Sequence, residues 1–362
     1  MEDRSRYLWG YMDYLKLAVI LVIVLNHSIQ YEWNAYKILS NDFQNPTLLF
    51  ASGVIFSYCI AKLGKYPTFA NLLKKKAKRL LIPLFCTLFL YYFPFIKITN
   101  RFIPFDANYD RPFHETAFDY LMGINIDHLW FLYALFILYV AFYPIVRKDV
   151  LLHTKKGQFC LLAFLFLLNI STLWQTPERF CLRQVMQYSF FFAGGFIYNL
   201  HAEKFFEKNE RGKRICLLVV AIVAAACLYA VDYATGFLAG KEYKGNEEWL
   251  PLLSAAEILK QSCLICLVCS GIRFLHERTA FFKFEIFPYL AKNSFRIYLF
   301  HQPVVRVFLP MIRSGIQPQS DMANLSCSLI TFSVAVAGSL FFSKIVDRLN
   351  AMPFRARPAS PV

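Results

Sequence analysis

The chain has 362 residues, of which 57% are hydrophobic, 18% aromatic and only 17% charged. This composition is unlike that of a soluble domain and indicates a membrane protein. The net charge of +15 would suit a nucleic-acid-binding protein, but the basic residues are distributed as in a membrane protein, which excludes that class.

Ten apolar segments are long enough to cross about 30 Å of hydrocarbon as α-helices. No internal repeat, low-complexity tract or flexible linker separates them. We therefore expect an all-α, polytopic membrane protein with about ten transmembrane helices. A single transmembrane domain would cover residues 1–350, followed by a short cytoplasmic tail over residues 351–362. The ten segments are residues 14–31, 47–63, 80–99, 128–146, 158–174, 185–200, 214–231, 249–272, 294–312 and 323–346.

Lysine and arginine gather in alternate segments between the apolar stretches. Cytoplasmic loops of membrane proteins carry such an excess of positive charge, so both termini are predicted to lie in the cytoplasm. The run KKKAKR at residues 74–79 precedes an apolar stretch and is predicted to be a cluster at the membrane surface, with no nucleic acid as partner. The basic segments are the N-terminus, residues 62–79, 147–156, 204–214 and 273–296, and the C-terminal tail.

The first predicted helix carries Lys16 near its cytoplasmic end and His27 in its outer half. Eleven residues of α-helix turn through about 1100° and rise about 16 Å, so the two side chains share a face, half a bilayer apart. Ionisable groups in a bilayer usually face a cavity or a partner. Lys16 could instead place its ammonium group among lipid headgroups. His27 either moves protons or simply bonds to a backbone carbonyl.

The second predicted helix contains FASGVIFSY at residues 50–58. Its adjacent small residues, Ser52 and Gly53, predict close packing against another helix.

Two further histidines fall in predicted helices. His128 opens the fourth helix at the external interface, beside Trp130, which is a typical interfacial residue; both an anchoring and a site role remain open for this histidine. In the ninth helix His301 precedes Pro303, which removes a backbone donor and frees carbonyl groups. His301 therefore either bonds to those carbonyls or faces a ligand.

The eighth predicted helix carries charged and sulfur-containing side chains. Glu257 and Lys260 are three residues apart, so the main expectation is a structural ion pair, with a proton relay as the alternative. Cys263, Cys266 and Cys269 are also spaced by three. Without a convergent histidine or carboxylate we expect them to pack and predict no metal site.

Short motifs in the first half of the chain match those of one family. A basic residue, ten arbitrary residues and a histidine occur at Lys16–His27, after MDYL. Phe50, Ser52 and Gly53 are similar to a Phe-x-x-Ser-Gly pattern, with one residue fewer between Phe and Ser. KAKRLLIP at residues 76–83 matches an Arg-x-x-Arg pattern that runs into Leu-x-Ile-Pro, with Lys76 in the first place and Arg79 in the last.

Two later motifs complete the series. HLWFLYAL at residues 128–135 matches a fourth-helix signature, and IYLFHQPV at residues 297–304 matches a late Tyr-Leu-x-His-x-Pro element. Together the five motifs make the chain resemble the integral-membrane acyltransferase family 3, whose members modify cell-surface and periplasmic glycans. The His-x-Pro ending is similar to the branch that succinylates periplasmic glucans.

The resemblance implies an O-acyltransferase of a bacterial inner (cytoplasmic) membrane. The donor would be cytoplasmic acyl-CoA, either acetyl-CoA or succinyl-CoA, with no permanently bound cofactor. The acceptor would be a hydroxyl of an extracytoplasmic glycan or glycolipid. A secondary transporter or glycan exporter, with Glu257 and Lys260 as coupling sites, is the rival class.

The resemblance also implies roles for individual residues. His27 would be the general base, with His128 and His301 as further catalytic candidates. Lys76 and Arg79, helped by Lys16, would bind the phosphates of CoA; lysine offers a point charge where arginine offers a planar fork. In the external loop 100–127, the aromatic side chains either stack on sugar rings or cap the interface, namely Phe102, Phe105, Tyr109 and Phe113.

Overall fold

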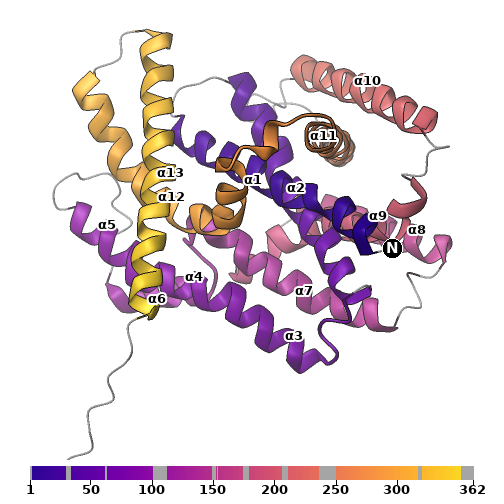
Figure 1. The fold of residues 1–362 in the computed structure, drawn as a ribbon, viewed down its shortest axis with the longest axis horizontal. Coiled ribbons are helices and arrows are strands. Elements are labelled where there is room, and N and C mark those ends of the chain that lie inside the picture. The colour runs from indigo at the N-terminus through magenta and orange to yellow at the C-terminus, as the bar shows by residue number, and fades with distance from the viewer. Residues whose placement is uncertain are drawn as a thin grey trace, which may run out of the picture.

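A computed structural model of the chain describes residues 2–29, 34–61, 63–100, 112–148, 152, 154–173, 179–205, 211–235, 250–316 and 320–351. Every regular element within these ranges is helical (Figure 1). Four stretches among the described residues are long and apolar enough to cross a membrane: Gly10–Ser28, Asp127–Arg147, Leu250–Arg278 and Met322–Arg348. The predicted all-α, polytopic membrane fold is therefore confirmed.

Helical residues occupy most of each of the ten apolar segments predicted from the sequence. The main α-helices are α1 (Glu2–Ser28), α2 (Asn34–Ala61), α3 (Phe69–Lys76), α4 (Ile82–Cys86), α5 (Phe93–Asn100), α6 (Phe113–Leu121), α7 (Trp130–Lys148), α8 (Lys155–Ile170), α9 (Leu182–Phe205), α10 (Arg211–Thr235), α11 (Leu250–Arg278), α12 (Ile286–Ile316) and α13 (Asp321–Ala351). Beyond Ala351, the expected cytoplasmic tail lies outside the described residues.

The third predicted span is a run of helix with two wide turns. Between α3, α4 and α5 lie two π-helical segments, η1 (Ala77–Leu81) and η2 (Thr87–Tyr92). Each shortly precedes a proline, Pro83 or Pro94. A proline has no amide hydrogen and its ring clashes with the carbonyl four residues earlier, and a widened turn relieves that clash. The first wide turn carries Arg79 and directly follows Lys76.

Helices α2 and α9 approach so closely that each needs a glycine at the crossing. A Cβ atom on Gly53 would overlap the Phe192 carbonyl oxygen, and one on Gly195 would overlap the Phe50 carbonyl oxygen. The close packing predicted from Ser52 and Gly53 is thus confirmed, and its partner is the stretch of α9 from Phe192 to Phe196, which contains Gly195. The crossing lies in the main core, where Phe56 and Phe192 are fully buried.

Helix α1 connects the parts of the fold that build the site. It packs against α2, α11, α12 and α13. Helices α12 and α13 pack along each other, and Arg296 forms a two-pronged ion pair with Asp347, with both N–O distances at 2.6 Å. Helix α10 packs on α11 at the outer edge of the molecule (Figure 1). This arrangement brings the outer half of α1 against the middle of α12.

Candidate active site

Three histidines from separate parts of the chain meet in one cluster. His27 comes from the end of α1, His128 from the short 3₁₀ helix η4 (Asp127–Leu129) before α7, and His301 from the middle of α12. The ring centroids are 5.3 Å apart for His27 and His301, 6.2 Å for His27 and His128, and 4.6 Å for His128 and His301. The structure therefore brings all three histidine candidates together.

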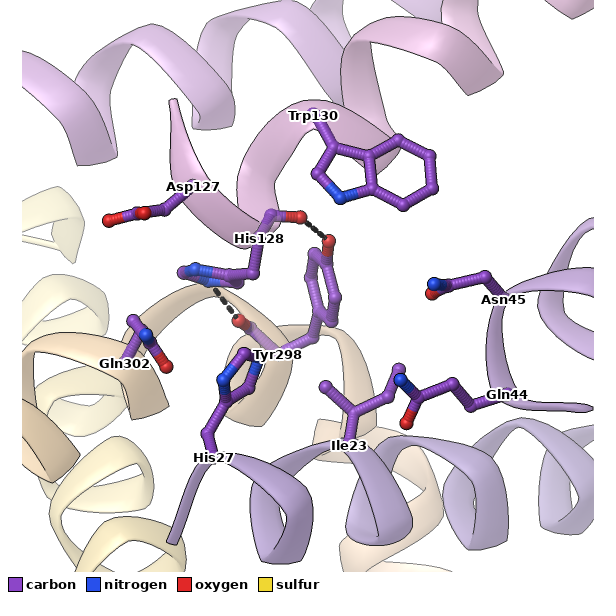
Figure 2. Close-up of a pocket in the computed structure, with 9 residues that line it drawn as sticks. All are labelled: Ile23, His27, Gln44, Asn45, Asp127, His128, Trp130, Tyr298 and Gln302. Carbon is purple, nitrogen blue, oxygen red and sulfur yellow. Dashed lines mark hydrogen bonds between the residues drawn. The ribbon is translucent and has the colours of Figure 1, made fainter. Parts of the chain in front are cut away.

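Tyr298 fixes two of these rings. Its carbonyl oxygen accepts a hydrogen bond from His128 Nε2 at 2.9 Å (Figure 2) and another from His301 Nδ1, also at 2.9 Å. Its hydroxyl donates in turn to the backbone carbonyl of His128. A carbonyl oxygen can only accept, so each bonded nitrogen carries a hydrogen and the opposite nitrogen carries the lone pair. His128 Nδ1 and His301 Nε2 are therefore hydrogen-bond acceptors.

His27 differs from the other two. Its side chain is partly exposed, and no hydrogen bond fixes either ring nitrogen within the described part of the chain. It lines a cavity of about 290 Å³ together with Ile23, Gln44, Asn45, Asp127, His128, Trp130, Tyr298 and Gln302 (Figure 2). Amides, a carboxylate, a phenol and an indole suit a ligand that carries several hydroxyl groups and an apolar face.

An ion pair holds the two helices that carry the fixed histidines. Arg306 Nη2 on α12 lies 2.6 Å from Asp127 Oδ2, next to His128. Asp127 has a positive φ of 44°, a conformation that costs a non-glycine residue energy and persists where the surroundings hold it. The ion pair and the Tyr298–His128 hydrogen bonds thus both join α12 to the η4 segment that carries His128.

Breaking this ion pair is expected to destabilise the site. Arg306→Gln leaves a partly buried carboxylate without its guanidinium partner, and we expect the unfolding free energy to fall by about 1–3 kcal/mol, since both groups keep some solvent contact. Thermal unfolding in detergent measures this change. Adding Asp127→Asn removes the second charge and is expected to recover part of the loss; a further fall of similar size would contradict the interpretation.

Trp130, which is expected at the external interface, is also a residue of the cavity. It lines the cavity and stacks on Tyr188 of α9, with centroids 5.5 Å apart and an interplanar angle of 16°. Phe113, expected in the aromatic external loop, begins α6 and packs edge-on against Phe93. Phe102, Phe105 and Tyr109 lie outside the described residues.

The basic candidates lie away from the histidine cluster. Lys16 pairs with Asp13 at 2.7 Å, and its side chain is 27% exposed. Lys76 is buried, with its ammonium group inside an aromatic cage formed by Phe56, Tyr66 and Tyr139, 3.2 Å from the Tyr139 ring centroid. Burial, with the positive charge of Arg79 nearby, lowers the pKa of Lys76 to about 7. Arg79 itself is exposed.

Along three separate stretches of helix, eleven residues separate a cavity residue from either Lys16 or an aromatic residue of the cage around Lys76. His27 is eleven residues from Lys16 on α1, Asn45 is eleven residues from Phe56 on α2, and His128 is eleven residues from Tyr139 in η4 and α7. Eleven residues of helix rise about 16 Å. The aromatic cage and Lys16 therefore lie roughly half a membrane thickness from the cavity.

The family model for the acyltransferase 3 family, an acyltransferase domain, matches residues 9–344. The chain belongs to the acyltransferase 3 family. It is therefore a membrane acyltransferase, and the match spans all three clustered histidines and all three basic candidates. Searches of curated proteins and of solved structures found no match to the chain.

Glu257 and Lys260, the coupling sites that a transporter would use, form ion pairs with neighbouring charged side chains in this acyltransferase. The expected Glu257–Lys260 ion pair is present at 2.5 Å, and Lys260 also lies 3.1 Å from Asp42 of α2. Tyr229 of α10 donates a hydrogen bond of 2.7 Å to Asp42. The cluster joins α2, α10 and α11, which supports the structural interpretation. Among the described residues no group of three or more histidine, cysteine or acidic side chains is placed to hold a metal ion.

Several cavity residues of the acyltransferase were missed in the sequence. Gln44 and Asn45 precede the predicted start of the second span at residue 47, so they were outside the search for polar groups in helices. Gln302 follows His301 directly, and its Oε1 is buried without a hydrogen-bond partner among the described residues. Uncharged polar residues next to a candidate histidine are the signal that could have identified it.

Proposed function

We propose that the chain is an O-acyltransferase that moves an acetyl or succinyl group from cytoplasmic acyl-CoA to a hydroxyl of an extracytoplasmic glycan or glycolipid, in a bacterial cytoplasmic membrane. The observation that carries this proposal is the position of His27. It is the histidine of the cluster that lines the cavity with no ring nitrogen held by a described hydrogen bond, and an acyl transfer to a hydroxyl requires a base there.

The proposed reaction balances without an external proton donor. One ring nitrogen of His27 takes the hydroxyl proton while the hydroxyl oxygen attacks the thioester carbonyl carbon. The carbon–sulfur bond then breaks, and the protonated His27 returns the proton to the departing thiolate. The products are the ester and free CoA thiol. Family membership supports the acyl transfer itself, and the free ring of His27 supports its assignment as the base.

The lining of the cavity favours a sugar as acceptor. The Trp130 indole, stacked on Tyr188, offers an apolar face to the C–H groups of a sugar ring. Asn45, Gln44 and Gln302 offer amide groups to its hydroxyls. A cavity of about 290 Å³ has room for a single sugar ring, so one residue of a glycan would enter it.

The separation between the cavity and the basic groups fits a CoA donor. Arg79 is exposed beside the buried Lys76, and both belong to a basic segment predicted to face the cytoplasm. An extended phosphopantetheine arm is long enough to cover about 16 Å. Its phosphates would lie near Arg79 while its thioester lies beside His27.

Sided proteoliposomes test the proposal. The purified protein is reconstituted, acyl-CoA is supplied on the side that carries the Lys74–Arg79 segment, and an oligosaccharide is supplied on the opposite side. We expect oligosaccharide ester to form in this arrangement and to fall to background when donor and acceptor exchange sides. Equal ester formation in both arrangements would contradict the predicted division of the site.

Donor binding is expected to weaken as pH rises above 7. The pKa of Lys76 is about 7 in the free protein, and a bound phosphate would raise it, so binding takes up a proton. The dissociation constant for CoA should then rise by up to about tenfold per pH unit between pH 7 and 9. Isothermal titration calorimetry measures it, with Lys78→Met, an exposed neighbour, as control. Lys76→Met should remove the dependence; an unchanged slope in that variant would exclude Lys76 as its source.

A further inference from the structure

One ring nitrogen of His301 has no hydrogen-bond partner among the described residues. Its Nδ1 donates to the carbonyl oxygens of Tyr298 and Ile297, at 2.9 and 3.2 Å, so Nε2 carries the lone pair. The side chain is 0% exposed, and Nε2 is unpaired within the described part of the chain. Leaving a buried acceptor unpaired typically costs about 1–3 kcal/mol, so such an atom calls for an explanation.

Two histidine rings lie close enough to be considered as donors to this nitrogen. His128 is 4.6 Å away between centroids, but its Nε2 hydrogen is committed to the Tyr298 carbonyl and its Nδ1 is itself an acceptor. His27 is 5.3 Å away, with its ring tilted by 37°. Its hydrogen is not committed to any described acceptor. Of these two rings, His27 is therefore the one that can donate.

We propose that His301 is a positioning residue for His27, with His301 Nε2 accepting a hydrogen bond from one ring nitrogen of His27. That bond selects the tautomer of His27 and leaves its other nitrogen, with the lone pair, for the cavity. The inference rests on the proposed function of His27 as base. His301 is not among the residues that line the cavity, so it acts through His27 and not on the acceptor.

The bond also serves the protonated state. When His27 takes the hydroxyl proton, both of its nitrogens carry hydrogen, and the imidazolium donates one of them to His301. A hydrogen bond from an ionised donor is stronger than a neutral one. Because His301 is held by two backbone carbonyls, its acceptor is already oriented before the charge appears, as for the third group that orients a catalytic base.

A matched pair of variants tests this role. In His301→Gln the side-chain amide oxygen can occupy the position of Nε2, whereas in His301→Asn the shorter amide reaches only the position of Nδ1. We expect His301→Asn to lower kcat by roughly 10- to 100-fold, with little change in KM for the donor. His301→Gln should keep kcat within about threefold of wild type. Equal losses in both variants would overturn the proposal.

Coupling between the two histidines separates this inference from the proposed function. If His301 acts through His27, His301→Asn should cause no further loss in a His27→Ala background. A loss of the same size as in the wild-type background would overturn the positioning role alone. Wild-type kcat in His27→Ala would instead overturn the proposed function.

A measurement on the wild-type protein avoids dependence on folding of the variants. In protein labelled with ¹⁵N-histidine, a scalar coupling across the N–H···N bond between His27 and His301 is expected. His27→Ala should remove it, and His128→Gln should retain it. Absence of the coupling in the wild-type protein would overturn the proposal.

Discussion

Replacement of His27 by alanine is expected to lower kcat for acyl transfer by about 10²- to 10⁴-fold, the contribution of a positioned general base. A sugar hydroxyl is a weak nucleophile, and His27 is the cavity-lining histidine whose ring is not tied to a described backbone group. Release of CoA thiol from acyl-CoA, measured with and without acceptor in proteoliposomes, gives kcat directly.

Folding of this variant should be close to normal. His27 is partly exposed and its ring makes no described hydrogen bond, so its loss removes little stabilising interaction beyond the bond proposed to His301. His114→Ala provides a matched control, because His114 is exposed on α6 and does not line the cavity. We expect wild-type activity for His114→Ala. A kcat within threefold of wild type in a folded His27→Ala protein would remove His27 from the mechanism.

Alanine at Gly195 is expected to destabilise the fold by about 3 kcal/mol or more. A Cβ atom there would overlap the Phe50 carbonyl oxygen and crowd the Phe50 Cα at 3.1 Å. Backbone atoms cannot rotate away as a side chain can, so α2 and α9 would have to separate over a crossing that lies in the main core. The apparent unfolding temperature in detergent and the yield of monodisperse protein measure the effect.

The neighbouring glycine gives the control for this prediction. A Cβ atom on Gly194 meets nothing within 4 Å, so Gly194→Ala should leave stability unchanged or raise it by up to about 1 kcal/mol through better helix propensity. Two variants with the same chemical change, one residue apart, then differ only in what the methyl group contacts. Similar unfolding temperatures for both would show that the α2–α9 approach is looser than the structure indicates.

The sequence predicted the helices and the identity of the clustered histidines because both depend on local patterns. Long apolar runs determine where helices form in a membrane protein, and ionisable residues within them are few enough to be candidates individually. His27, His128 and His301 could each be named this way. Their meeting at one cavity depends on how α1, α12 and η4 pack, which no spacing along the chain specifies.

The remaining features of the site depend on contacts between distant segments. Tyr298 is an ordinary aromatic residue in the sequence, and its role comes from a carbonyl oxygen that accepts from two histidines. Asp42 pairs with Lys260 across more than 200 positions. Lys76 belongs to a run of basic residues that predicts a cluster at the membrane surface, yet its side chain is buried against Tyr139. Local patterns carry no information about such partners.

The most direct test of the account is mass spectrometry of envelope glycans from three cell populations. One makes the wild-type protein, one makes His27→Ala at matched abundance, and one makes neither. We predict an acetyl or succinyl ester on a glycan that appears only with the wild-type protein. Equal ester in the wild-type and His27→Ala samples would contradict the assignment of His27, and identical spectra in all three would contradict glycan acylation by this chain.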